Sequence, residues 1–156
     1  PPEIFVQQFE RVAVGFDHAL AELRATLPPA LTRPTGAGES SAAMGVTSAQ
    51  RQALTRECGV AEAAAIHFRS SANQARFVMA RQAVTSAKTV EAAAPHRAAM
   101  EKVLQDEIAL ARRLYAIQSR DSRIGFEASN QYYYVPVDLM EKVLNCHDLL
   151  AHAFPK

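Results

Sequence analysis

The sequence predicts an all-α domain: a four-helix bundle with a long flexible connector after its first helix and an irregular polar and aromatic segment before its last. Four stretches carry apolar residues at spacings of three and four, the period of one helix face. No alternating strand pattern of useful length occurs, except over residues 132–135. Four apolar faces are buried most simply by packing the helices against one another.

The first helix is expected over residues 4–27, because one helical face collects Phe5, Phe9, Val12, Phe16, Leu20, Leu23 and Leu27. Pro28 and Pro29 end it. Residues 28–46 are rich in Pro, Gly, Ser and Ala, which indicates a loop or a disordered connector.

A second helix is expected from Thr47 or Ser48, whose hydroxyl can cap free N–H groups, to about Ala87. Gly59 is expected to interrupt it. After this glycine the apolar pattern resumes through Ile66, Phe77 and Val84.

Pro95 fits the first turn of a third helix that runs to about Ser119. Its stripe consists of Met100, Leu104, Ala111 and Leu114. A fourth helix follows Pro136 and carries Leu139, Val143, Leu150 and Phe154.

Length and composition fit one globular domain. The 156 residues are expected to form a single unit over 1–156 and to bury roughly two-thirds of the unfolded surface. An apolar content of 49% excludes a wholly disordered chain. The chain starts Pro-Pro without an initiator Met, so we expect a piece excised from a longer protein, extracytoplasmic if that parent is secreted.

Charge and cysteine content exclude several kinds of partner. The 17 basic and 16 acidic residues are mixed along the chain, which argues against nucleic-acid binding. No apolar run approaches the roughly 18 residues of a spanning helix, so no membrane partner is expected. Cys58 and Cys146 fit no zinc motif and are expected to be small buried thiols, with a disulfide between them left open.

Several polar residues fall on the stripes expected inside the bundle, or beside them: Ser70, Asn73, Arg76, Arg81, Glu107 and His147. A buried charge without a partner costs several kcal/mol, so Glu107 is expected to pair, for example with Arg76 or Arg81. A second interpretation is that this polar end faces a ligand or a neighbouring domain.

Catalytic and metal motifs are absent from the sequence. Carboxylate-bridged metal bundles use Glu-x-x-His on two helices, and this chain has no such motif. Gly-x-Ser-x-Gly, the phosphate loop and the dinucleotide fingerprint are missing too. We therefore assign no metal, no cofactor and no catalytic residue, and expect this chain alone to be non-catalytic; a small metalloenzyme stays open as a third alternative.

The segment 121–135 concentrates hydrogen-bonding groups after the third helix. Guanidinium groups such as that of Arg123 suit carboxylates, which could belong to a carboxylated sugar or to Asp121 and Glu127 of the same chain. Asn130 could cap or bridge a turn. Three consecutive tyrosines from Tyr132 cannot share one face, so we expect one to pack on the core and another to be exposed.

Three phrases of the sequence resemble a known helical module: PPEIFVQQFERVAVGFDHAL (1–20), SSANQARFVMARQAV (70–84) and EIALARRLYAIQSRDSRIGFEASNQYYYVPVDLMEKVLNC (107–146). This module closes large bacterial glycoside-hydrolase-like proteins of the α-glucuronidase-like and hexosaminidase-like kind. The phrase DSRIGFEASN is its most specific part, and the connector 28–46 lies outside the resemblance.

The resemblance implies a non-catalytic accessory module behind a catalytic (β/α) barrel. Its partners would be the parent's catalytic domain and carbohydrate, and the catalytic carboxylates would lie on the barrel. Residues expected at the domain boundary or beside sugar are Arg76, Arg81, Glu107, Arg123, Glu127, Asn130 and Tyr132. A free-standing helical interaction or dimerisation domain that uses the tyrosine segment stays open as the alternative.

Overall fold

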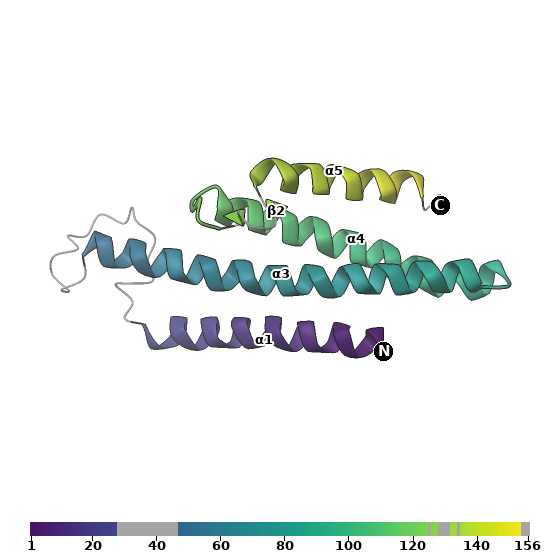
Figure 1. The fold of residues 1–156 in the computed structure, drawn as a ribbon, viewed down its shortest axis with the longest axis horizontal. Coiled ribbons are helices and arrows are strands. Elements are labelled where there is room, and N and C mark those ends of the chain that lie inside the picture. The colour runs from purple at the N-terminus through teal and green to yellow at the C-terminus, as the bar shows by residue number, and fades with distance from the viewer. Residues whose placement is uncertain (28–46, 125, 128–131, 134, 154–156) are drawn as a thin grey trace.

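The computed structural model describes residues 1–27, 47–124, 126–127, 132–133 and 135–153 (Figure 1). It confirms the all-α bundle-like architecture. The helices are α1 (Pro2–Thr26), α3 (Ser48–Ser86), α4 (Val90–Gln118) and α5 (Pro136–His152). Two short antiparallel strands, β1 (Phe126–Glu127) and β2 (Tyr132–Tyr133), lie between α4 and α5. The predicted connector 28–46 lies outside the described residues.

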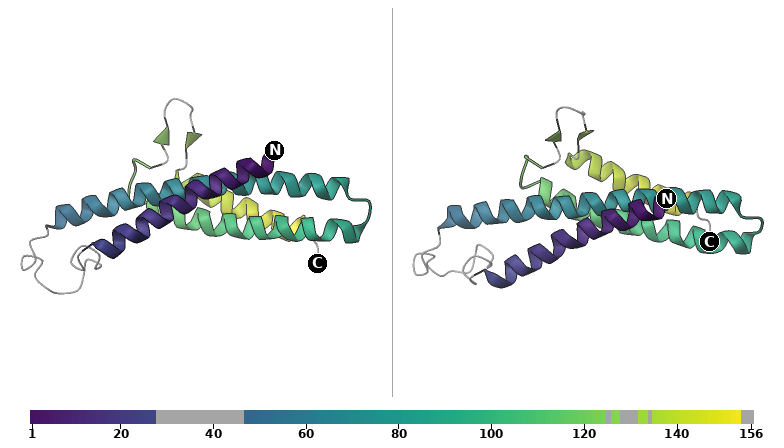
Figure 2. Two further views of the ribbon diagram at one scale, coloured as in Figure 1. Left: turned by 90° about the horizontal axis from the view of Figure 1, so that it is seen from below. Right: turned by 60° about the horizontal axis from the view of Figure 1, so that its bottom comes forward.

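Consecutive helices run in alternating directions and pack side by side (Figures 1 and 2). The extensive contacts join α1 to α3, α3 to α4 and α4 to α5. The α3–α4 hairpin is therefore the centre of the molecule, with α1 on one side of it and α5 on the other. α1 packs mainly against α3, whereas α5 packs mainly against α4 and also reaches α3 through side chains.

Local sequence explains where the long helices begin. At α3, the Thr47 hydroxyl accepts a hydrogen bond from the Gln50 N–H (3.2 Å), and the Gln50 side chain accepts one from the Thr47 N–H (2.8 Å). The prediction that Gly59 interrupts this helix is wrong: α3 continues through it. The glycine lies against Ile117 and Ile124, and this packing outweighs its low helix propensity.

The predicted start of α4 at Pro95 is also wrong. Thr89 accepts a hydrogen bond from the Ala92 N–H (3.1 Å) and begins the helix at Val90, so Pro95 lies inside it. The helix ends at Gln118, close to the predicted end. α1 starts earlier than predicted, because Pro2 is compatible with the first turn of a helix.

The buried face of α1 differs from the predicted stripe. Its buried residues are Val6, Ala13 and Leu20, seven positions apart. Of the predicted stripe, Leu20 is buried, Phe9 and Phe16 are half-buried, and the remaining members from Phe5 to Leu23 are exposed. Small residues on α3, Ala65, Ala72 and Ala80, are buried at a similar spacing. Alanines therefore occur on both helices at this contact, with the larger Val6 and Leu20 on either side of Ala13.

Three ion pairs, here called the α1–α3 ion-pair row, fix how these two helices align. They join Glu10 to Arg76, Asp17 to Arg69 and Arg24 to Glu62. Successive pairs are seven residues apart on both helices, and the third pair has the opposite polarity. A seven-residue slip in either direction, or a parallel arrangement, would therefore bring like charges together. The pairs are partly exposed, so they contribute more to register than to stability.

The main core lies between α3, α4 and α5. One cluster consists of Ala63, Ile66, Ala111, Leu114, Ile117 and Leu139. A second cluster consists of Leu104, Ile108 and Cys146, with Phe77, Val143 and Leu150 at its margin. Of these nine cluster residues, the predicted α4 and α5 stripes supply four: Leu104, Ala111, Leu114 and Leu139. Phe154 lies outside the described residues.

The full burial of Ala13 on α1 predicts the effect of enlarging its side chain. Ala13→Leu should lower the free energy of unfolding by about 1–3 kcal/mol, because the added atoms must separate the two helices. Ala21→Leu on the exposed side of the same helix should change it by less than about 0.5 kcal/mol. Urea unfolding followed by circular dichroism measures both, and equal effects would contradict close packing at Ala13.

Candidate functional site: a buried glutamate that joins three helices

Glu107 is the most buried charged residue among those the structure describes, with 5% of its surface exposed. It lies on α4 next to the core residues Leu104 and Ile108, as its place on the apolar stripe predicted. A carboxylate in such a position needs hydrogen-bond donors, because desolvation otherwise costs several kcal/mol.

Two neighbouring helices supply those donors. From α3, the Ser70 hydroxyl donates to Oε2 of Glu107 and the Asn73 amide donates to Oε1, both at 2.8 Å. From α5, the Lys142 ammonium forms an ion pair with Oε2 and donates to the Ser70 Oγ at 2.8 Å. Both carboxylate oxygens are thus engaged, and Glu107 holds α3, α4 and α5 together.

The network extends from Asn73 to α1. The Arg76 guanidinium donates to Oδ1 of Asn73 (3.1 Å) and forms an ion pair with Glu10. The expectation that Glu107 is paired is confirmed, but Arg76 and Arg81, given as example partners, do not bind it directly. Lys142 of α5 takes that role, and its side chain is 26% exposed.

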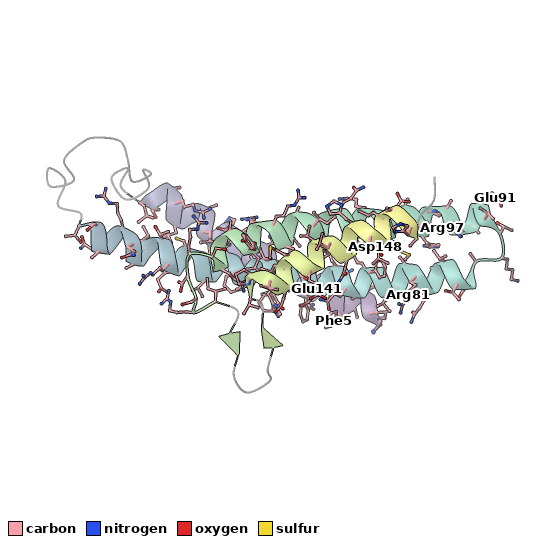
Figure 3. All side chains as sticks on the ribbon, turned by 90° about the horizontal axis from the view of Figure 1, so that it is seen from above. Phe5, Arg81, Glu91, Arg97, Glu141 and Asp148 are labelled. Atoms are coloured by element: carbon pink, nitrogen blue, oxygen red, sulfur yellow. The ribbon has the colours of Figure 1, made fainter. Side chains whose placement is uncertain are left out.

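Two other residues expected near the interior are exposed. Arg81 lies on the surface of α3 (Figure 3), and His147 lies on the exposed side of α5. Cys146 takes the inner position that His147 was expected to hold. Both cysteines are free thiols, so the disulfide left open by the sequence does not form. Burial raises the pKa of the Cys146 thiol; Lys142 opposes this rise and Glu107 adds to it.

A second charged group follows the end of α4. The Arg123 guanidinium donates to both oxygens of Asp121, from Nε to Oδ1 at 2.9 Å and from Nη2 to Oδ2 at 2.6 Å. Glu57 of α3 is 3.7 Å from the same guanidinium. The hydrogen bonds from Arg123 lower the pKa of Asp121 to about 2, and Asp121 raises the pKa of Arg123. The Arg123 guanidinium, which the sequence analysis considered for a carboxylated sugar, therefore binds the Asp121 carboxylate of its own chain.

The remaining predicted residues lie in the strand segment. Glu127 and Tyr132 face each other in the β1–β2 pair, and the structure describes only their backbones. Asn130 lies outside the described residues. Of the predicted set, the structure joins Arg76 to Glu107 through Asn73 and places Arg123 in a separate group.

Glu62 was missed by sequence reasoning although it also joins three helices. On α3, it pairs with Arg24 of α1 and accepts a hydrogen bond from Nε of Arg113 on α4 at 2.6 Å. The available signal was the seven-residue spacing of Glu62, Arg69 and Arg76, with charges complementary to positions on α1. That pattern becomes meaningful only when α1 and α3 are known to be neighbours.

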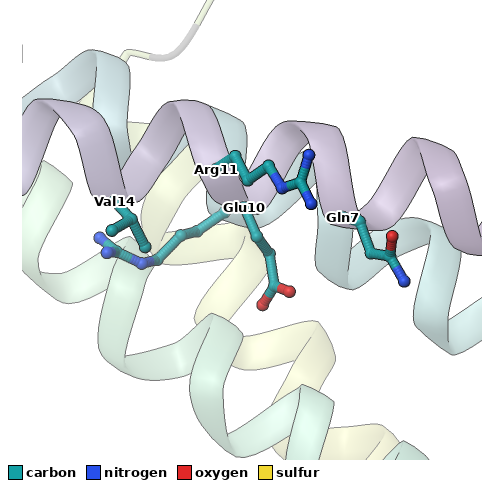
Figure 4. Close-up of a pocket in the computed structure, with 5 residues that line it drawn as sticks. Gln7, Glu10, Arg11 and Val14 are labelled. Atoms are coloured by element: carbon teal, nitrogen blue, oxygen red, sulfur yellow. The ribbon is translucent and has the colours of Figure 1, made fainter.

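Two open hollows border the network. A groove of about 810 Å³ is lined by residues of α1, α3 and α4 that include Glu10, Asn73, Arg76 and Asp106. A hollow of about 400 Å³ is lined by Gln7, Glu10, Arg11, Val14 and Arg69 (Figure 4). Acidic and basic side chains alternate in both, and Glu10 and Arg69 are already engaged in ion pairs.

This arrangement is suited to holding helices in place. The Glu107 carboxylate is held by three donors. The described ranges contain no group of three or more His, Cys, Asp or Glu side chains that could hold a metal ion.

No described helix is long and apolar enough to cross a membrane. Comparison with known proteins gives no match, either to a family model, to a curated protein or to a solved structure.

The burial of Glu107 predicts a strong effect of removing its cation. Lys142→Met should lower the free energy of unfolding by about 2–4 kcal/mol, since the carboxylate stays buried while the ammonium is lost. This is below the loss for a fully buried pair, because the Lys142 side chain is 26% exposed. Lys102→Met, which breaks an exposed pair with Asp106 on α4, should cost less than about 0.5 kcal/mol. Similar losses in the two variants would show that Glu107 does not depend on Lys142.

The Asp121–Arg123 pair predicts a pH effect at the end of α4. The folded-state pKa of Asp121 is lowered to about 2, so its stabilising effect is present above the usual aspartate pKa of about 4 and is lost as the pH falls through 2. An NMR titration of the Asp121 carboxyl carbon should have its midpoint near 2. Arg123→Gln should move the midpoint toward 4, whereas Glu57→Gln should leave it in place. An unchanged midpoint in Arg123→Gln would exclude the guanidinium as the cause.

Proposed function

We propose that this chain is a non-catalytic helical module of a larger carbohydrate-active protein, where it supports the catalytic domain. The observation that carries the supporting role is the Glu107 network, whose carboxylate is fully engaged in joining helices. A general acid or base would instead need an oxygen within reach of a substrate. The glycoside-hydrolase-like parent is supported by the sequence resemblance alone.

The outer face of α5, formed by Val137, Met140 and Leu144, supports docking against the parent's catalytic domain. These side chains are 63%, 49% and 68% exposed, and their spacing of three and four places them on one side of the helix. Leu139 and Cys146 are buried on the opposite side. Contacts with α3 and α4 cover the inner side of α5, and the described chain leaves the outer side uncovered, as is typical of a surface that binds a partner.

A contribution to sugar binding rests on the resemblance and on the place of Arg123. Its side chain is 55% exposed although it is bound to Asp121, so one edge of the guanidinium still faces solvent after α4. β1 and β2 follow directly in the chain. In the proposed parent, this segment would lie at the border with the catalytic domain and contribute polar and aromatic contacts there.

The coding sequence upstream of Pro1 tests the parent class. We expect it to encode a (β/α) barrel with its own pair of catalytic carboxylates. A start codon at this point would contradict the proposal and would favour the alternative of a free-standing interaction domain.

The docking role predicts the effect of a charge on the outer face of α5. In the full-length protein, Leu144→Glu should increase the rate of proteolytic cleavage between module and catalytic domain at least several-fold, because a buried glutamate weakens the interface. The matched control is Val90→Glu, at an exposed valine at the far end of α4. Equal cleavage rates in both variants and the parent protein would exclude docking through α5.

A further inference from the structure

The outer face of α1, formed by Phe5, Val12, Ala19 and Leu23, is exposed beside the row that packs on α3. Phe5 stacks on Phe9 with ring centroids 4.1 Å apart. Phe9 and Phe16 both contact Phe68 of α3, with centroid distances of 5.5 and 6.2 Å. An aromatic surface therefore extends from the α1–α3 contact to solvent. Together with Phe9 and Phe16, this face has the alternating spacing of four and three found in helices that pack along their length.

Gly15 lies in the middle of α1, beside this face. Within a helix, glycine costs about 1 kcal/mol relative to alanine. No heavy atom lies within 4 Å of the position that a Cβ would take, so packing among the described residues does not require the missing side chain. A second helix that approaches α1 closely at this point would require it.

We propose that α1 pairs with α1 of a second copy of this chain in an antiparallel arrangement, with the two-fold axis level with position 14. This arrangement places Phe5 level with Leu23 of the second copy, and Val12 level with its Phe16. The bulky Phe9 lies level with the small Ala19. Each contact occurs twice, as two-fold symmetry requires, and no phenylalanine lies level with another phenylalanine.

The residues beside the outer face agree with this orientation. Gln8 lies about two residues, roughly 3 Å along the axis, from the level of Glu22 of the second copy, close enough for its amide to donate to the carboxylate. Gly15 lies nearly level with its own counterpart, where side chains would hold the helices apart. A parallel pair would place phenylalanine against phenylalanine and Glu22 against Glu22, and would align the two helix dipoles. Size and charge both favour the antiparallel pair.

The size of this surface predicts a weak dimer. From Phe5 to Leu23 it is about 27 Å long at a rise of 1.5 Å per residue. One pair of helices of this length buries less than the roughly 800 Å² per partner of a standard interface, so we expect a weak dimer whose population depends on concentration. The outer faces of α1 and α5 lie on opposite sides of the α3–α4 hairpin, so self-association does not depend on the docking role of α5 (Figure 1).

Sedimentation equilibrium of the 156-residue chain between 1 and 300 μM tests the pairing. Val12 and Val14 are both exposed valines of α1, with 41% and 58% of their surfaces exposed. Only Val12 belongs to the outer face, so Val14 serves as the control. Val12→Glu should weaken the dimer at least tenfold, whereas Val14→Glu should not change it. Thermal unfolding verifies that both variants fold. A wild-type chain that is monomeric throughout, or equal weakening by both variants, would overturn the proposal.

Oxidative cross-linking tests the orientation in a Cys58→Ser background, in which the remaining Cys146 is buried. Gly15→Cys should form a disulfide-linked dimer, because this position meets its own counterpart at the two-fold axis. Glu22→Cys should remain monomeric, because antiparallel pairing places the two copies of this position far apart. Cross-linking through Glu22→Cys would indicate a parallel pair. Absence of cross-linking through Gly15→Cys would exclude the proposed two-fold axis. Either result contradicts the proposal. The upstream coding sequence has no bearing on these outcomes.

Discussion

The buried carboxylate of Glu107 is the constraint on which the arrangement of α3, α4 and α5 depends. Apolar side chains tolerate small shifts along a helix axis, but a buried charge that loses its donors does not. Ser70, Asn73 and Lys142 must all reach the same two oxygens. One side chain thereby selects a single register for both neighbours of α4, within a core of ordinary aliphatic residues.

On the other side of the α3–α4 hairpin, the α1–α3 ion-pair row fixes the register of α1 against α3. Its charges are partly exposed and contribute little stability, but their order distinguishes one alignment from its alternatives. Arg76 connects the two systems, because it binds Glu10 of the row and Asn73 of the Glu107 network. The positions of all four helices are thus linked through polar contacts, although apolar burial supplies most of the folding free energy.

Sequence periodicity predicted the helices and the burial of Glu107, because Glu107 shares a stripe with Leu104. It could not predict Lys142 as the partner, since this depends on how α5 is rotated against α4. For α1, the phenylalanines dominated the pattern and concealed the smaller row of Val6, Ala13 and Leu20 that is buried. Pro95 was misplaced because the capping role of Thr89 was overlooked. Membership of a larger carbohydrate-active protein stays a proposal, because only the sequence resemblance supports it.

The connection between α1 and α3 has a consequence for the order of folding. Residues 87–89 join α3 to α4, so that hairpin can form from its turn outward at little cost in chain entropy. Even the ion pair nearest the connector, Arg24 to Glu62, closes a segment of 38 residues. We therefore expect α1 to join the domain after this hairpin has formed, because closing the longer segment costs more chain entropy. Phe9 and Phe16 of α1 are thus expected to reach Phe68 only when the surface of α3 that receives them is already in place.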